Sequence, residues 1–359
     1  MTKCHVLYLA CTAAIVGTGL GAAPAAVGHP YHAIHVVKQG QSIQKAVDAA
    51  DPGDTVYVSA GTYRESVTVT TDGVTLRGAG SRTVLRPAPV KKKAAAGTCA
   101  ADGNGICLIG TKDRKVKGVT VADLTVTGFT KNGVYATGTD KLTVRQVTAR
   151  KNGVWGIATE ASERTVLRGN TARDNGDAGL FLANTVKEER GATETRGTLV
   201  QGNRLEGNRI GVTVRRLRDL TVAGNLMTGN CAAVFVVGDE NKPKAGRVTV
   251  RDNRIVGNNK SCPKTARLDA LQGSGIVLTG AEDSVVTGNE IRDNAGTSPL
   301  SGGIVLFKSF VGTTSERNRI SDNRLSGNSP ADLVVTDTAG KGNTFERNTC
   351  KASKPAGLC

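Results

Sequence analysis

Large aromatic side chains and histidines are scarce in this chain of 359 residues. Aromatics make up 3% of the sequence, and the four histidines are His5, His29, His32 and His35, all near the N-terminus. A helical or sandwich core normally contains more large side chains, so a thin core of Val, Ile and Leu with many turns fits better. The absence of histidine beyond residue 35 argues against histidine-dependent catalysis.

Motifs for metals and cofactors are also missing. The sequence contains no Cys-x-x-Cys pair, no metal-spaced histidine cluster, no glycine-rich phosphate loop and no Ser-His-Asp set. Zinc-type sites need several Cys or His ligands at close spacing, and nucleotide sites need a glycine-rich loop around the phosphates. We therefore expect neither a metal site nor a cofactor.

An apolar run at the N-terminus is typical of a signal peptide. Lys3 provides a positive charge, residues 6–20 are mainly apolar, and the stretch Ala-Pro-Ala at 23–25 offers small residues for cleavage. The run is short for a membrane span, although an N-terminal anchor stays open as the alternative. We expect residues 1–25 to be a signal peptide and the protein to be secreted, with no membrane contact after its removal.

Positive charge exceeds negative charge in the chain. The formal net charge is +16, and removal of residues 1–25 takes away Lys3 and no acid, which leaves +15. A scattered excess of this kind attracts polyanions such as acidic polysaccharides, teichoic acids or nucleic acid. A solvated basic surface without a partner is the alternative.

The dominant pattern is a pair of asparagines five positions apart, which occurs six times. The first asparagines of the six pairs are Asn170, Asn203, Asn225, Asn253, Asn289 and Asn323. Upstream of most pairs is a short alternating run, and downstream is a Gly or Ala with an apolar triplet, as in "GIVL". The shortest intervals between copies are 20 to 23 residues, the length of one coil of a parallel β-helix. Longer intervals are coils with inserted loops, and the lack of a 3.6-residue period excludes a helical solenoid.

Such a coil explains the asparagines. Equivalent positions of neighbouring coils lie ~4.8 Å apart, so stacked asparagine side chains can hydrogen-bond to one another in a ladder. Asparagine also tolerates the left-handed backbone of sharp turns. We therefore expect each pair to mark two corners of the coil.

With these repeats, the sequence resembles the right-handed parallel β-helix repeat proteins of the pectin-lyase-like superfamily. The stretch "SIQKAVDAADPGDTVYVSAGTYRESVTVTTDGVTLRGAG" is similar to their N-terminal part. The resemblance implies an all-β fold, a single right-handed parallel β-helix of about ten coils with a short N-terminal capping helix. Ser42 can cap that helix, and Asp-Pro-Gly at 51–53 would end it. We expect the cap and first coils over 26–104, repeats over 105–350 and a disulfide-tied tail over 351–359.

The resemblance does not extend to the motifs of the enzymes in this superfamily. The "NTD" and "RIK" motifs of polygalacturonases, the "GYQD"-type motif of pectin methylesterases and the "DPHE" motif of alginate epimerases are absent. The sequence therefore supports none of these activities.

Inserted loops indicate where a binding site lies. They come before the apolar triplet, from Asn259 and Ala295, and after it, from Asn184 and Gly238, so both sets flank one face of the helix. Strand alternation directs side chains outward on that face. The substrate-binding candidates there are Trp155, Glu160, Phe181, Phe235 and Phe307. Aromatic faces suit sugar rings, but loops that bury the rings as a secondary core are an equal alternative.

Acidic residues near this face provide candidates for catalysis. Glycoside hydrolysis needs two carboxylates, and polysaccharide lysis needs a base. The best set is Asp239 and Glu240 with Arg215 one coil earlier. Adjacent acids in a surface loop are more often only solvated, so whether the protein is an enzyme stays open.

Six cysteines remain after residues 1–25 are removed, and an even number in an exported chain indicates disulfides. The expected pairs are Cys99–Cys107, Cys231–Cys262 and Cys350–Cys359. The central pair follows from register, because Cys231 adjoins Asn230 and Cys262 lies four residues past Asn258, the same corner one coil later. Cross-pairing of the outer cysteines would span most of the solenoid.

Together these patterns predict a secreted, monomeric protein that binds an acidic extracellular polysaccharide or cell-wall polymer. Cleavage of that polymer by a lyase or hydrolase mechanism is an open extension. A non-catalytic cell-wall or surface-binding module is the alternative, and specific nucleic-acid binding ranks below both because the charge is dispersed.

We expect the mature protein to begin near Ala26, directly after the Ala-Pro-Ala stretch. N-terminal sequencing of the protein recovered from the culture medium checks this cleavage site. Recovery of a chain that keeps residues 6–20 in the membrane fraction would instead establish an anchor.

Overall fold

The computed structural model describes residues 32–89, 95–111, 113–266, 268–336 and 340–359. The predicted signal peptide and its cleavage site lie outside the described residues. Residues 32–359 form one compact unit, and within its described part no helix is long and apolar enough to cross a membrane.

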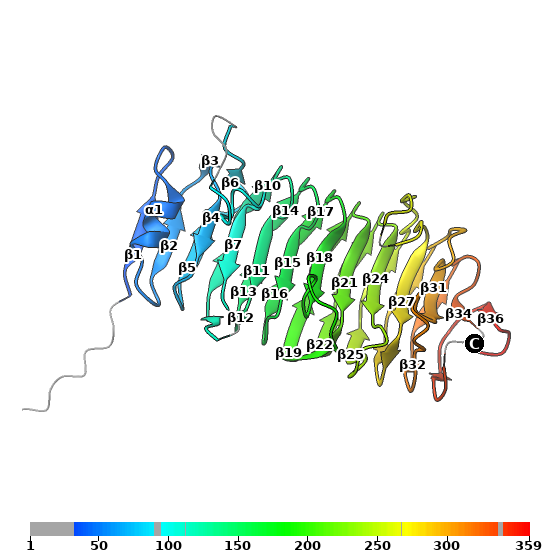
Figure 1. Ribbon diagram of the computed structural model, residues 1–359. Coiled ribbons are helices and arrows are strands. Elements are labelled where there is room, and N and C mark those ends of the chain that lie inside the picture. Colours follow the sequence, from blue (N-terminus) through cyan, green and yellow to red (C-terminus); the bar gives the residue numbers. More distant parts are fainter. Residues whose placement is uncertain (1–31, 90–94, 112, 267, 337–339) are drawn as a thin grey trace, which may run out of the picture. The chain divides into compact units, whose positions relative to one another are not determined.

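Parallel strands build three long sheets, and between Thr55 and Val335 each coil passes through them in the order A, B, C (Figure 1). Sheet A contains β1 (Ile34–Val37), β2 (Thr55–Val58), β5 (Thr75–Gly78), β9 (Thr120–Ala122), β13 (Thr143–Arg145), β16 (Val166–Arg168), β19 (Thr193–Gln201), β22 (Leu217–Ala223), β25 (Ala245–Arg251), β29 (Val285–Thr287), β32 (Arg319–Ser321) and β35 (Thr344–Glu346), with β28 (Ala281–Glu282) beside β25. Sheet B contains β3 (Gly61–Arg64), β6 (Thr83–Arg86), β10 (Thr125–Thr127), β14 (Thr148–Arg150), β17 (Thr171–Arg173), β20 (Arg204–Glu206), β23 (Leu226–Thr228), β26 (Arg254–Val256), β30 (Glu290–Arg292) and β33 (Arg324–Ser326).

Sheet C carries the apolar triplets of the repeat. It contains β4 (Val67–Val69), β7 (Ile106–Ile109), β11 (Val134–Thr137), β15 (Ile157–Glu160), β18 (Ala178–Ala183), β21 (Ile210–Arg215), β24 (Ala232–Val237), β27 (Ser274–Thr279), β31 (Gly302–Phe307), β34 (Leu333–Val335) and β36 (Ser353–Lys354). A short pair, β8 (Val116–Lys117) with β12 (Thr139–Asp140), lies outside the three sheets. The predicted all-β, right-handed parallel β-helix is confirmed, and the ten strands of sheet B agree with about ten coils.

Helix α1 (Ile43–Asp48) adjoins the first coils. The Ser42 side chain accepts a hydrogen bond from the backbone N–H of Lys45, as expected for an N-cap. Ile43 and Val47 are buried in the same core as the strands of these coils. That the helix covers the open end of the solenoid stays a prediction.

The core is a narrow column of aliphatic side chains enclosed by the three sheets. One inward row of sheet A shows its composition, since every member is fully buried. The row comprises Val144, Leu167, Val200, Val222, Val250, Val286 and Ile320. Small and medium aliphatic chains fill this space because each coil is thin, which explains how the fold forms with so few aromatics.

Two asparagine ladders run along the corners of the coils. The A–B ladder comprises Asn170, Asn203, Asn225, Asn253, Asn289, Asn323 and Asn348, with Nδ2 to Oδ1 distances of 2.9–3.0 Å. The B–C ladder joins Asn152, Asn175, Asn208, Asn230, Asn258, Asn294 and Asn328 at 2.8–3.1 Å. In both ladders the backbone N–H of each asparagine also donates to the next Oδ1, as between Asn208 and Asn230 at 3.0 Å. The predicted ladders are therefore present.

The expectation that asparagine itself takes the left-handed backbone is wrong. The residue before each ladder asparagine has the positive φ, for example Gly202 at 62°, Asp252 at 53° and Asp293 at 58°, and no described asparagine does. An asparagine uses both its backbone N–H and its side chain in the ladder. The reversal of the chain therefore falls on the preceding residue, which is Gly or Asp at every rung except those preceded by Lys151 and Arg347.

Replacement of a central ladder residue should destabilise the solenoid. Asn208→Ala removes the acceptor of the backbone N–H and Nδ2 of Asn175, and it removes the Nδ2 that donates to Ala172 O and Asn230 Oδ1, all in a buried corner. We expect the free energy of unfolding to fall by roughly 2–4 kcal/mol, measured by urea denaturation.

The half-buried last rung of the A–B ladder provides the control. Asn348→Ala should cost clearly less than Asn208→Ala. An equal cost for the two variants would show that ladder position and burial do not determine stability.

Candidate functional site

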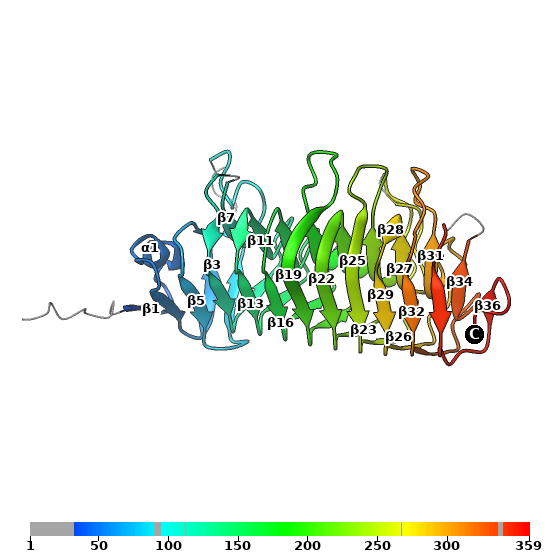
Figure 2. The same cartoon turned by 90° about the horizontal axis from the view of Figure 1, so that it is seen from below.

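Inserted loops lie along both edges of the outer face of sheet C. Residues 184–192 and 238–244 follow β18 and β24 and lead into sheet A, whereas 259–273 and 295–301 lead from sheet B into β27 and β31. Figure 2 shows the loops that follow β18 and β24 projecting from the same side of the coils.

A pocket of about 880 Å³ lies between the first and third of these loops. Its lining combines aromatic, cationic and acidic side chains from several coils. Those residues include Trp155, Phe181, Phe235, Arg209, Arg215, Lys260, Asp177 and Glu189. We refer to this cavity as the sheet C pocket.

Phe181 and Phe235 share one column with Thr213 and lie in an apolar cluster separate from the core inside the coils, as expected for outward side chains. The rings are nevertheless buried, with exposed fractions of 6% and 1%, and they belong to a second apolar cluster with Leu271 and the Cys231–Cys262 disulfide. The loops thus cover the face as the alternative interpretation foresaw, and an open aromatic groove floor is wrong. Both rings still border the pocket.

Trp155 and Phe181 form an aromatic stack on the pocket wall. Their ring centroids lie 4.0 Å apart with an interplanar angle of 5°. The indole Nε1 donates a hydrogen bond to Asp177 Oδ2 at 3.0 Å, which fixes the orientation of the tryptophan ring. A flat apolar wall with a carboxylate beside it is the result.

Arg209 is the most constrained cation of the pocket. Its side chain is buried, its Nη1 donates to Pro263 O at 2.6 Å, and its Nη2 donates to Asp269 O at 2.9 Å. Burial lowers the pKa of Arg209, and the nearby charge of Asp177 opposes that shift. The buried Nε has no hydrogen-bond partner among the described residues, and the side chain of Arg209 lines the pocket.

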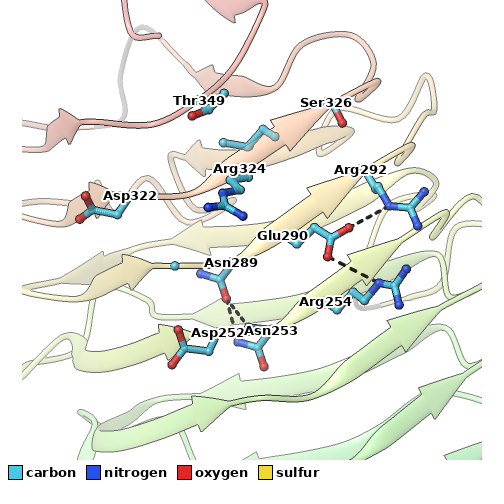
Figure 3. A pocket seen from close by; sticks show the side chains of 12 residues that line it. Asp252, Asn253, Arg254, Asn289, Glu290, Arg292, Asp322, Arg324, Ser326 and Thr349 are labelled. Atoms are coloured by element: carbon cyan, nitrogen blue, oxygen red, sulfur yellow. Dashed lines mark hydrogen bonds and ion pairs between the residues drawn. The ribbon is translucent and has the colours of Figure 1, made fainter.

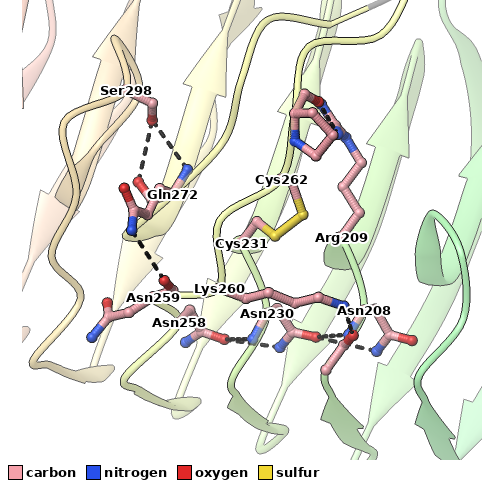
Figure 4. Close-up of a disulfide and its surroundings, with 12 residues drawn as sticks. Asn208, Arg209, Asn230, Cys231, Asn258, Asn259, Lys260, Cys262, Gln272 and Ser298 are labelled. Atoms are coloured by element: carbon pink, nitrogen blue, oxygen red, sulfur yellow. Dashed lines mark hydrogen bonds between the residues drawn. A yellow bond between two sulfur atoms is a disulfide. The ribbon is translucent and has the colours of Figure 1, made fainter.

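The Cys231–Cys262 disulfide holds the loop that Arg209 contacts (Figure 4). The two Cα atoms are 6.0 Å apart, and Cys262 pairs with Leu271 across the base of the loop at N–O distances of 2.9 and 3.1 Å. The structure also joins Cys99 to Cys107 and Cys350 to Cys359, the pairs that the sequence predicts. The coil register therefore places the cysteines as the asparagine spacing indicated.

The three predicted catalytic residues do not meet in the pocket. Arg215 lines it and donates from Nη1 to Thr185 O at 3.0 Å. Asp239 forms an ion pair with Arg216 and accepts hydrogen bonds from Asn241, and Glu240 is exposed outside the lining. The chain turns at Arg216, which has a positive φ of 52°, and this turn places Arg216 rather than Arg215 beside the acid.

Two further candidates lie away from the pocket lining. Glu160 is buried and accepts hydrogen bonds from Tyr135 Oη at 3.2 Å and from the backbone N–H of Val186 at 3.0 Å, so it holds the base of the loop at 184–192. The pKa of Tyr135 is raised far above its usual range, mainly by burial and to a lesser extent by the charge of Glu160. Phe307 packs against Phe310, with ring centroids 5.5 Å apart.

Arg209, Asp177 and Lys260 line the pocket, but the sequence interpretation missed them. Each lies one or two positions after a B–C ladder asparagine, at the start of the turn into sheet C. Once the ladder is identified, the residues one or two positions after each B–C ladder asparagine can be predicted to face the edge of the pocket.

Reduction of the central disulfide should open the pocket without unfolding the coils. In a Cys231→Ser/Cys262→Ser variant we expect the emission of Trp155, the only tryptophan, to shift to longer wavelength as the loop leaves the indole. Fluorescence and quenching measurements check this, with far-ultraviolet circular dichroism to confirm that the strands persist.

The C-terminal disulfide is the matched control. A Cys350→Ser/Cys359→Ser variant should leave Trp155 emission unchanged, because that bridge lies in the tail. A red shift of equal size in both variants would contradict a local role for the Cys231–Cys262 bridge.

Comparison with known families identifies two overlapping matches. Residues 98–246 match the right handed beta helix region, and residues 183–357 match a family described as periplasmic copper-binding protein (NosD). No curated protein sequence matches the chain.

The described residues do not fit a copper site. Copper is bound mainly through His, Cys and Met side chains. The cysteines at 99–359 are all in disulfides, Met227 is in the core, and His35 hydrogen-bonds to Asp54 at 2.8 Å. The described residues contain no group of three or more potential metal ligands.

Several solved structures have a similar fold. The mannuronan C-5 epimerase AlgE4 A-module of Azotobacter vinelandii has a TM-score of 0.54 and 21% identity, over 86% of this chain and 90% of that one. DFA-IIIase of Arthrobacter chlorophenolicus A6 without its lid has a TM-score of 0.60 and 12% identity, over 89% and 98%. The family 28 exopolygalacturonase of Yersinia enterocolitica has a TM-score of 0.50 and 12% identity, over 88% and 78%. The chain is a right-handed parallel β-helix repeat protein with the pectin-lyase-like fold.

Proposed function

We propose that the protein is exported, acts as a monomer and binds a linear acidic polysaccharide in the sheet C pocket. The observation that carries this proposal is the positive charge of the pocket wall, where Arg209, Arg215 and Lys260 lie together. A ligand carboxylate in the pocket would form charge-assisted hydrogen bonds with these cations.

The other walls of the pocket suit a charged sugar. Arg215 and Lys260 add positive charge, and the Trp155–Phe181 stack adds an apolar wall for the carbon face of a pyranose ring. The pocket has room for a few sugar units by volume, about 880 Å³, within the usual range for ligand sites.

We propose that the protein binds the polysaccharide without cleaving it. Asp239 is engaged by Arg216, and Glu240 is not part of the pocket lining, so the proposed acids lack a shared substrate position. The similar structures include proteins named for mannuronan and for polygalacturonate chemistry. Their names support an acidic polysaccharide as the ligand class, but their enzyme motifs are absent from this sequence.

Export is supported by disulfide chemistry. Three disulfides in one chain are typical of oxidising compartments such as the periplasm and the cell exterior. The family matched over residues 183–357 is itself described as periplasmic. The N-terminal sequence features of a signal peptide agree with this location.

Loss of the Arg209 guanidinium should weaken binding of acidic oligosaccharide. For Arg209→Met we expect the dissociation constant for a short oligogalacturonate to rise about 10- to 100-fold, as for a lost charged hydrogen bond of ~1.5–3 kcal/mol. Calorimetric titration measures this, and unchanged product size after incubation with polymer checks for the absence of cleavage.

Arg254→Met, on the outer face of sheet B, is the matched control, because it removes the same charge outside the pocket. Wild-type protein should also bind polygalacturonate and alginate more strongly than neutral glucan. High salt should weaken that binding, because ions screen charge interactions over ~8 Å at physiological strength. Equal affinity of Arg209→Met and wild type, or equal retention on neutral glucan, would refute the proposed function.

A further inference from the structure

The outer face of sheet B carries a row of arginines in its N-terminal half. Arg64 pairs with Arg86 in register, and Arg150 pairs with Arg173, with Thr127 between the two pairs. Their strand neighbours Tyr63, Leu85, Ala149 and Ala172 are in the core. Alternation along the strand therefore turns all four arginines outward.

These arginines are nearly free of acidic partners. The side chains of Arg64, Arg86 and Arg150 make no ion pair or hydrogen bond within the part of the chain that the structure describes. Arg173 has one distant contact, from Nη1 to Asp174 Oδ2 at 3.7 Å, and its register neighbour on the next coil is Glu206, which pairs with Arg204. Arg64 and Arg86 are exposed, and Arg150 and Arg173 are half-buried.

The C-terminal half of the same sheet is different. There, Glu290 lies between Arg254 and Arg292, with Nε to carboxylate distances of 3.6 and 3.0 Å (Figure 3). Arg204 is likewise paired with Glu206. The same fold surface thus pairs Arg204, Arg254 and Arg292 with acids at one end, where Arg324 has no ion pair among the described residues, and leaves the four arginines at the other end nearly uncompensated. Arginines stacked at the ~4.8 Å strand spacing repel one another unless an anion lies between them.

A row of hydroxyl groups runs beside the arginines. Thr148 and Thr171 are neighbours in register, half-buried, two positions before Arg150 and Arg173, and their hydroxyls have no hydrogen-bond partner among the described residues. The surface therefore presents one guanidinium and one hydroxyl on each of two successive coils, whereas β6 has Val84 at the threonine position and β10 has Thr127 at the arginine position. No aromatic side chain faces outward from β6, β10, β14 or β17.

We propose that this arginine–threonine row is a second binding surface, which holds an extended stretch of a polyuronate chain along the coil stack. Each sugar of such a chain offers a carboxylate for a guanidinium and hydroxyls for the threonines. Single-stranded nucleic acid fits less well, because its binding depends on aromatic side chains for base stacking. The row would bind the same class of ligand as the sheet C pocket, but the two share no residue. Each proposal can therefore be refuted without the other.

The test compares two double variants of equal charge change. Arg150→Gln/Arg173→Gln removes the core of the row, and Arg254→Gln/Arg292→Gln removes two arginines of the same sheet that are paired with Glu290. We expect the first variant to bind long polygalacturonate about tenfold more weakly, from two surface pairs of modest strength. It should bind trigalacturonate as wild type does, and the second variant should bind both ligands nearly as wild type does.

The remaining outcomes separate the row from the pocket. If trigalacturonate fails to bind wild type while long polymer affinity still depends on Arg150 and Arg173, the pocket proposal fails and the row stands. Equal losses in the two double variants would show that only net charge matters and would overturn the row. So would an oligothymidylate that binds as tightly as long polygalacturonate and is lost equally in the first variant.

Discussion

The register between neighbouring coils is the constraint on which the structure depends. The strand pairs of the three sheets are parallel, and the asparagine ladders repeat their register at two corners; the pair β19–β22 is in step from Thr198 onward, after a shift between Glu194 and Thr198. Because a buried amide without its partner is costly, a slip of one residue would break backbone and side-chain hydrogen bonds together. The surfaces described above, outward rows included, are consequences of this fixed alignment.

Fixed register explains why so much of the fold was predictable. The five-residue spacing identifies two corners of each coil, and from them follow the inward and outward positions, the column that joins Phe181 to Phe235, and the disulfide partner of Cys231. Each of these depends on repetition alone. A pattern that recurs in many coils carries enough information to fix backbone geometry, even where each single copy is weak.

The binding site was much less predictable, and the reasons are local. Whether a loop covers an outward ring depends on its path, so the burial of Phe235 could not be read from alternation. The choice of Arg216 over Arg215 as the partner of Asp239 depends on one left-handed residue at a strand end. Arg209 was overlooked because it occurs once, in a turn, where the repeat gives no expectation for a charged residue.

The ladder geometry has a consequence for how such a protein can change. Successive rungs are separated by 22 residues between Asn208 and Asn230 and by 36 between Asn258 and Asn294, yet the Nδ2 to Oδ1 distances are 3.1 and 3.0 Å. Extra residues between rungs thus leave the ladder spacing unchanged. A change in the length of one coil does not alter the stacking of the other coils. The loops around sheet C can therefore be lengthened, exchanged or shortened one at a time while the β-helix stays the same.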